Sequence, residues 1–262
     1  MPSVLTGAYL ANRDLIYLGV SGDGDSASIG LGQFMHLMRR NVDMTYIVEN
    51  NGVYGLTKGQ FSATADKGSR SKRGAANDDE PIDLVMMALT LGASYVARGF
   101  SGDKEQLVPL IEAAIRHRGA ALIDVVSPCV AFNNHPGSTK SYDYVRAHNE
   151  AVNRLDFMPE RAPITTSQAP GETRDIVMHD GSTMRLKRLD AEYDPSDKVG
   201  AMAYLESHRA RGVVVTGLLY VAENASDMHD ALQTVDAPLN QLPDAELVPG
   251  SAALAGINAS LR

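Results

Sequence analysis

Two short runs of carboxylate, amide and glycine residues stand where a divalent cation and a phosphate group could bind. The first is Gly22-Asp23-Gly24-Asp25, which follows an apolar run directly and precedes a helical pattern directly. Glycines let the backbone approach a ligand closely, and a helix N-terminus offers free N–H groups to a phosphate. Because two carboxylates alone would repel a phosphate, the pattern indicates Mg²⁺ bridging a carboxylate and a diphosphate.

The second run extends from Glu49 to Thr57 and contains two asparagines and two glycines. An asparagine side-chain oxygen and a main-chain carbonyl there could complete the shell of a cation. Taken alone, each run is typical of a turn. However, 25 residues lie between Gly24 and Asn50, which is just enough for one helix and one strand. This spacing favours a paired ligand site over two unrelated turns.

The elements that must position these runs alternate between strand and helix patterns as far as about residue 130. We expect strands over residues 15–20, 44–48, 95–97 and 121–126, and helices over residues 28–40, 83–91 and 104–117. This alternation predicts an α/β fold with a mostly parallel sheet and helices on both faces. Ligands of such sheets bind at the carboxyl ends of the strands, where both runs fall.

The pattern changes after about residue 135. We expect a helix over residues 142–155, a hairpin with strands at 176–178 and 184–186, a helix over 199–211 and a strand over 213–221. The Asp180-Gly181 pair suits the tight turn of that hairpin. The last forty residues contain three prolines and predict a loosely ordered arm.

Composition excludes several classes of protein. The 262 residues carry 24 basic and 32 acidic side chains, a net charge of −8, which argues against a nucleic-acid partner. One cysteine, Cys129, can form neither an internal disulfide nor a self-contained cysteine metal site. No signal peptide and no apolar run of membrane-spanning length is visible. We therefore expect a cytoplasmic protein without a membrane partner.

Three runs of the sequence together resemble the beta subunit of 2-oxoacid:ferredoxin oxidoreductases, and most closely the 2-oxoglutarate branch of that family. They span residues 22–30, 39–46 and 50–60, with further similarity at 127–133 and 145–150. The resemblance implies a thiamine diphosphate-binding fold. It also implies a pyrophosphate-binding domain over residues 1–158, incomplete at its N-terminus, and a C-terminal extension for subunit packing over residues 159–262.

The resemblance also implies a set of site residues. Magnesium would be held by Asp23, Asn51 and the main-chain carbonyl of Val53. Thiamine diphosphate would be contacted by Gly22, Asp23, Gly24, Asp25, Asn51, Val53, Gly55 and Leu56. Lys58 matches a position that binds the distal carboxylate of the 2-oxo acid. No residue of this chain is assigned as the catalytic acid or base.

The activity implied by the resemblance is oxidative decarboxylation of 2-oxoglutarate. The acyl group passes to coenzyme A, and the electrons pass through a 4Fe-4S cluster to ferredoxin. The carboxylate that activates the aminopyrimidine comes from an alpha subunit in this family, so we expect no activity without that partner.

Cys129 marks the departure from the family pattern. It aligns with the last of four cluster-ligating cysteines, and the other three are absent from this sequence. We therefore expect Cys129 to be an orphan ligand and the chain to be a shortened or misassigned form. Two alternatives stay open: a thiamine diphosphate-dependent decarboxylase or synthase without a cluster, and a non-catalytic remnant that binds partner subunits.

Overall fold

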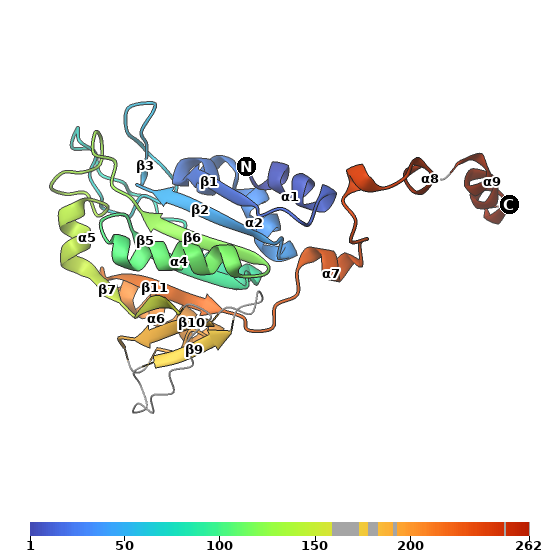
Figure 1. Cartoon of the computed structure of the whole chain (residues 1–262). Coiled ribbons are helices and arrows are strands. Elements are labelled where there is room, and N and C mark those ends of the chain that lie inside the picture. Colours follow the sequence, from blue (N-terminus) through green and yellow to red (C-terminus); the bar gives the residue numbers. More distant parts are fainter. Residues whose placement is uncertain (159–172, 178–182, 191–192, 249, 262) are drawn as a thin grey trace.

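A six-stranded sheet forms the centre of the molecule in a computed structural model (Figure 1). The structure describes residues 1–158, 173–177, 183–190, 193–248 and 250–261. The strand order is β1-β2-β6-β5-β11-β7. The members are β1 (Leu18–Gly22), β2 (Met44–Asn50), β6 (Ala120–Val126), β5 (Tyr95–Phe100), β11 (Val214–Val221) and β7 (Asn149–Ala151).

The first four strands of this order run parallel to their neighbours. Strand β11 then pairs antiparallel with β5 and parallel with β7. The carboxyl ends of β1, β2, β6 and β5 therefore share one edge of the sheet. The predicted α/β class is confirmed, and the strand predicted over residues 15–20 begins at Leu18 and continues to Gly22.

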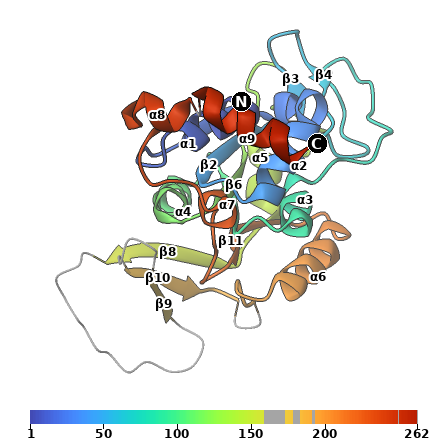
Figure 2. The same ribbon diagram turned by 90° about the vertical axis from the view of Figure 1, so that its right-hand side faces the viewer.

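Helices cover both faces of the sheet, as Figure 2 shows. One face carries α1 (Pro2–Ala11), α2 (Leu31–Arg40), α3 (Leu84–Leu91) and α6 (Lys198–Arg209), and the other carries α4 (Lys104–Arg116). Successive side chains of β6 point alternately into the hydrophobic cores on the two faces of the sheet. Leu122 belongs to the core that includes Phe34 of α2, whereas Ile123 belongs to the core that includes Leu110 of α4. Burial on both faces explains why this strand is apolar at every position except Asp124.

The helix predicted over residues 142–155 is wrong beyond His148. Helix α5 spans Tyr142–His148, and the chain then enters β7 and β8 (Asn153–Met158). Pairing with β11 accounts for the change. The Asn153 side chain donates from Nδ2 to the Leu218 carbonyl and accepts from the Leu218 N–H, both at 2.8 Å. Tertiary hydrogen bonds of this kind override a helical sequence pattern.

A second, antiparallel sheet has the order β8-β10-β9, with β9 (Thr173–Val177) and β10 (Thr183–Arg188). These two strands confirm the predicted hairpin strands, while its Asp180-Gly181 turn lies outside the described residues.

The C-terminal segment contains helices rather than only a loosely ordered arm. They are α7 (Met228–Leu232), a 3₁₀ turn (Leu239–Gln241), α8 (Asp244–Leu247) and α9 (Gly250–Ser260). His229 of α7 anchors the start of this segment, since its ring contacts the Tyr9 carbonyl of α1. Helices α8 and α9 lead away from the body in Figure 1, and neither buries a side chain. None of the described helices is long and apolar enough to cross a membrane.

The predicted boundary at residue 158 stays a prediction. Strand β11 and helix α6 come after it in the sequence, yet β11 lies in the main sheet and α6 packs against the same core. The segment after residue 158 therefore completes the sheet as well as extending beyond it.

Candidate diphosphate and cation site

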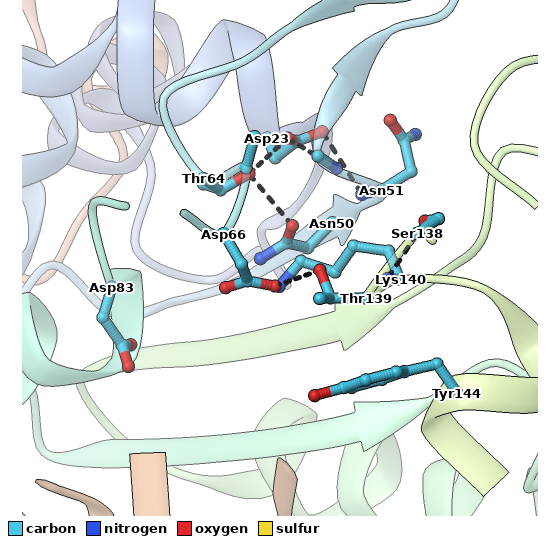
Figure 3. Close-up of polar contacts among 12 residues, drawn as sticks. Asp23, Asn50, Asn51, Thr64, Asp66, Asp83, Ser138, Thr139, Lys140 and Tyr144 are labelled. Carbon is cyan, nitrogen blue, oxygen red and sulfur yellow. Dashed lines mark hydrogen bonds and ion pairs between the residues drawn. The ribbon is translucent and has the colours of Figure 1, made fainter. Parts of the chain in front are cut away.

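The two sequence runs meet because β1 and β2 are parallel neighbours. Gly22 at the end of β1 pairs with Glu49 near the end of β2, so Asp23 and Asn51 emerge at the same edge. Asp23 Oδ1 accepts a hydrogen bond from the Asn51 N–H at 3.4 Å, and Oδ2 accepts one from the Gly52 N–H at 3.1 Å. The structure thus brings the carboxylate of the first run to the backbone of the second (Figure 3).

Asp23 is a buried carboxylate surrounded by donors. Its side chain has 1% of its surface exposed, and the hydroxyls of Ser62 and Thr64 both contact Oδ2. Throughout the described ranges, no lysine, arginine or histidine forms an ion pair with it. Two N–H groups and two hydroxyls stabilise the anion but add no positive charge, and a buried anion is costly without a counter-charge. A cation at Oδ1, the less engaged oxygen, would supply that charge.

The chain after Asp23 forms a π-helical turn over Gly24–Ile29 before α2 begins, where the sequence predicted only an α-helix from residue 28. Wide turns of this type are frequent at functional sites. A Cβ atom on Gly24 would lie 2.4 Å from Cε1 of Tyr54, so any larger residue would force the turn or the Tyr54 ring to move. The Ser26 hydroxyl donates to the Gly22 carbonyl at 2.9 Å and fixes the turn on the strand end.

Asn51 and Val53 form a tight local turn. The Asn51 side-chain oxygen accepts a hydrogen bond from the Val53 N–H at 3.1 Å, which is the geometry of an Asx turn. Asn133 Nδ2 holds the Asn51 carbonyl at 2.8 Å. Figure 3 shows the Asn51 side chain turned away from Asn50. Two of the three predicted magnesium ligands, Asn51 and Val53, therefore lie on one turn of backbone, and the third, Asp23, contacts that turn through the Asn51 N–H.

The remaining predicted residues occupy the tip of a hairpin formed by β3 (Val53–Tyr54) and β4 (Gln60–Phe61). Leu56 has 99% of its surface exposed, and Lys58 is also exposed, with a positive φ of 80°. Asp25 is exposed on the neighbouring turn. Asp23 is buried, whereas these side chains are exposed in the described part of this chain.

Cys129 lies beneath the same hairpin. It is half-buried, and a Cβ atom added to Gly55 would lie 3.5 Å from its sulfur. As the chain's single cysteine it could supply one sulfur ligand. No cluster of three histidine, cysteine, aspartate or glutamate side chains suited to a metal occurs among the described residues.

Sequence reasoning missed the polar side chains that support the site. They are Ser62, Thr64, Asp66, Arg98, Asp124, Asn133, Thr139 and Lys140. Several of them, together with Asn50 of the second run, line a cavity of about 300 Å³ at the carboxyl ends of β2, β5 and β6. One signal was available, because Asp124 interrupts an otherwise apolar strand. Arg98 lies within β5, and the remaining side chains come from loops whose positions relative to the sheet no local pattern determines.

Lys140 and Asp66 form a charge pair on the wall of this cavity. Lys140 Nζ lies 3.2 Å from Asp66 Oδ2, and the Thr139 hydroxyl donates to the same oxygen at 2.6 Å. Burial alone would raise the pKa of Asp66, but the Lys140 charge and the Thr139 hydrogen bond outweigh it and lower this pKa. Burial likewise opposes the charge on Lys140, whose pKa Asp66 nevertheless raises. Both groups are therefore charged at neutral pH.

Comparison with known proteins identifies similar chains. Residues 1–125 match the family model described as the thiamine pyrophosphate enzyme, C-terminal TPP binding domain. The chain is 40% identical over 173 residues to the 2-oxoacid:ferredoxin oxidoreductase subunit beta of Sulfolobus sp, which covers 66% of this chain and 54% of that relative. It is 40% identical over 134 residues to the 2-oxoglutarate oxidoreductase subunit KorB of Mycobacterium tuberculosis, covering 51% of this chain and 36% of the relative.

A solved structure extends the comparison to most of the chain. It is the 2-oxoglutarate:ferredoxin oxidoreductase from Magnetococcus marinus with 2-oxoglutarate, coenzyme A and succinyl-CoA bound, at 31% identity and a TM-score of 0.65. The match covers 88% of this chain and 65% of that one. The chain spans about half the length of the Sulfolobus relative. These matches confirm the family resemblance and the thiamine diphosphate-binding α/β fold predicted from the sequence.

Proposed function

Since this chain is a relative of the beta subunits of 2-oxoacid:ferredoxin oxidoreductases, we propose that it binds thiamine diphosphate and Mg²⁺ as the beta subunit of a 2-oxoglutarate:ferredoxin oxidoreductase. The observation that carries the proposal is the buried Asp23 carboxylate, which has four hydrogen-bond donors and no basic partner among the described side chains. Its place at the ends of two parallel strands is where α/β sheets bind ligands.

The donor set suits magnesium, which prefers oxygen ligands and takes few from the protein. Asp23 Oδ1, the Asn51 side-chain oxygen and the Val53 carbonyl would hold it, with phosphate oxygens and water completing the shell. The backbone of Gly22, Gly24 and Asp25 would lie along the diphosphate. Gly24 supports this role, because its missing side chain lets the turn pack on Tyr54 without a clash.

The hairpin tip would lie over the reactive half of the cofactor. Gly55 and Leu56 would cover it once other parts of the enzyme enclose the exposed tip, and Lys58 would bind the distal carboxylate of the 2-oxo acid. Bound thiamine diphosphate supplies the carbanion stabilisation for decarboxylation, while this chain supplies position and charge. An alpha subunit, coenzyme A and ferredoxin would be the partners of the full reaction.

Cofactor binding is testable without turnover. Calorimetric titration of the full chain with thiamine diphosphate should show saturable heat in the presence of Mg²⁺ and almost none with EDTA. The melting temperature should rise with cofactor concentration, because a ligand that binds only the folded state stabilises it. Absence of both effects at millimolar thiamine diphosphate, with or without the alpha subunit, would refute the proposal.

The single cysteine favours a second candidate, a thiamine diphosphate-dependent decarboxylase that does no cluster electron transfer. The two functions differ in product. The oxidoreductase reduces ferredoxin and forms succinyl-CoA from 2-oxoglutarate, whereas a simple decarboxylase releases CO₂ and succinic semialdehyde and reduces nothing. Iron analysis of the purified complex, together with product identification, separates them.

A further inference from the structure

A continuous chain of buried polar contacts connects the Asp23 carboxylate to the cavity behind it. The Thr64 hydroxyl contacts Asp23 Oδ2 and lies 3.1 Å from Asn50 Oδ1, and Asn50 Nδ2 donates to Asp124 Oδ1 at 2.9 Å. Arg98 Nε then donates to Asp124 Oδ2 at 2.8 Å. In Figure 3, dashed lines join the first members of this series, Asp23, Thr64 and Asn50. Asp124 itself is shielded from solvent, with 1% of its surface exposed.

The ion pair at the far end fixes the orientation of the Asn50 amide. Asp124 is ion-paired with Arg98, so its carboxylate is ionised and only accepts hydrogen bonds. Asn50 must therefore turn its NH₂ group toward Asp124 and its oxygen toward Thr64. If Asn50 were reversed, two acceptors would face each other in a buried site, which costs the full desolvation of both.

This orientation makes Asn50 Oδ1 an acceptor for the Thr64 hydroxyl besides Asp23 Oδ2. The Ser62 hydroxyl also lies 3.0 Å from that of Thr64, but its oxygen already accepts a hydrogen bond from the Thr64 N–H at 3.4 Å. A hydroxyl donates one hydrogen, so these acceptors compete for it. While Asp23 carries an uncompensated charge, it is the stronger acceptor. When a cation ligates Asp23, that advantage falls, and Asn50 Oδ1 is in place to take the hydrogen.

We propose, resting on the proposed function, that Asp124 is a positioning residue for the cation site. By holding Asn50 it provides Thr64 with an alternative acceptor. When a cation at Asp23 Oδ1 neutralises the carboxylate, the Thr64 hydroxyl can turn from Asp23 Oδ2 to Asn50 Oδ1 and stay hydrogen-bonded. Asp124 and Arg98, which line the cavity, would then support the diphosphate site from behind. Residues that do not touch the cation would control the affinity of the site for it.

The test measures binding of Mn²⁺, as a probe for Mg²⁺, from the loss of the free-ion electron paramagnetic resonance signal in the presence of thiamine diphosphate. In Asp124→Asn the new amide can either donate to or accept from Asn50, so the orientation of the Asn50 amide is no longer fixed. We expect Mn²⁺ affinity to fall about tenfold, the lower end of the range for second-layer changes around metal sites. Asn50→Ala removes the alternative acceptor but keeps the Arg98–Asp124 pair, and should give a similar loss.

A double-mutant cycle shows whether the effect runs through the Thr64 hydroxyl. In a Thr64→Val background there is no hydrogen to redirect, so Asp124→Asn should change the affinity less than twofold. In a Thr64→Ser background, which keeps the hydroxyl, the tenfold effect should return. Asp227→Asn is the matched control. Asp227 is also a buried aspartate paired with an arginine, Arg118 at 2.9 Å, but it does not contact Asp23, Thr64, Asn50 or Asp124.

The outcomes separate the inference from the proposed function. Wild-type protein that binds neither Mn²⁺ nor thiamine diphosphate refutes both. Wild-type binding together with unchanged affinity in folded Asp124→Asn and Asn50→Ala refutes the inference alone. So does an equal loss of affinity in the Thr64→Val background, since the effect would then bypass the hydroxyl. Circular dichroism spectra establish folding for each variant.

Discussion

The cation half of the site and the hairpin tip differ in how far this chain completes them. The cation half consists of Asp23, Asn50, Ser62 and Thr64, whose side chains are connected by hydrogen bonds and are at least nine-tenths buried, and of Asn51, whose N–H donates to Asp23. The hairpin tip consists of Gly55, Leu56 and Lys58, and Leu56 is fully solvated in the isolated chain. The fold alone therefore preorganises the end that would hold diphosphate, whereas the end that would face substrate depends on further surfaces.

Replacing Asp23 tests the cation half most severely. In Asp23→Ala the four surrounding donors lose their acceptor and the cation loses its charged ligand, so thiamine diphosphate affinity in Mg²⁺ should fall more than 100-fold, that is by more than about 2.7 kcal/mol. Asp25→Ala, at the exposed carboxylate two positions later, is the control and should cost less than tenfold. Equal losses in a calorimetric titration would contradict the distinction between the two carboxylates.

Gly24→Ala tests whether the close packing of the π-helical turn matters. The added methyl group would lie 2.4 Å from the Tyr54 ring, so the turn or the hairpin must shift. We expect about a tenfold loss of cofactor affinity and a loss of about 1–3 kcal/mol in the free energy of unfolding, typical of overpacking. Tyr54→Ala in the same chain should restore part of both.

Gly32→Ala serves as the matched control for that substitution. Gly32 lies in α2, where an added Cβ meets nothing within 4 Å, so the change should stabilise the helix by about 0.5–1 kcal/mol. Destabilisation of both glycine variants to the same extent would show that the Tyr54 contact is not the cause.

Lys58→Ala tests the hairpin tip, where stability and function should separate. Because Lys58 is exposed, its loss should leave the melting temperature unchanged within about a degree. In the assembled enzyme the KM for 2-oxoglutarate should rise about tenfold, while the KM for pyruvate, which has no distal carboxylate, should stay the same. An equal rise in KM for both substrates would show that Lys58 does not bind the distal carboxylate.

The smallest expected effect is on the melting temperature and its pH dependence, through the Asp66–Lys140 pair near the cation half. The Lys140 charge and the Thr139 hydrogen bond lower the folded-state pKa of Asp66 against the opposing effect of burial. A depressed pKa gives stability that is present above the unfolded pKa and is lost as pH falls through the folded one. Asp66→Asn should therefore lower the melting temperature by about 1–3 °C at pH 7, because the pair is partly exposed. Thermal scans at decreasing pH should show the gap closing toward pH 3, and a gap independent of pH would exclude this charge pair as its source.

Sequence patterns predicted the parallel part of the sheet because its strands are apolar runs separated by helices of regular period. Residues 121–126 and 44–48 show this, since both lie within observed strands of the main sheet. The pattern misled between residues 149 and 155, where pairing of β7 with β11 and hydrogen bonds from Asn153 replace a local helical preference. Sequence-distant partners of this kind leave no periodic signal.

The site shows the same division. Asp23 and Asn51 could be placed together because each directly follows a strand, and adjacent parallel strands end at one edge. Thr64 and Asn133 could not, because their positions depend on how two irregular loops cross the sheet edge. The π-helical turn was equally hidden, since an added residue in a turn changes the hydrogen-bond pattern without changing composition.

Helix α9 has a consequence for how the molecule responds in solution. Its 11 residues bury no side chain, and helices shorter than about 12 residues are marginal in water without tertiary packing. Its amide protons should exchange with deuterium almost as fast as those of an unstructured peptide, while the fully buried strand β6 retains its protons until the domain unfolds globally. Among the described segments, a protease would accordingly cleave first beyond α7, leaving a shortened chain that keeps Asp23, Asn51 and the residues around them.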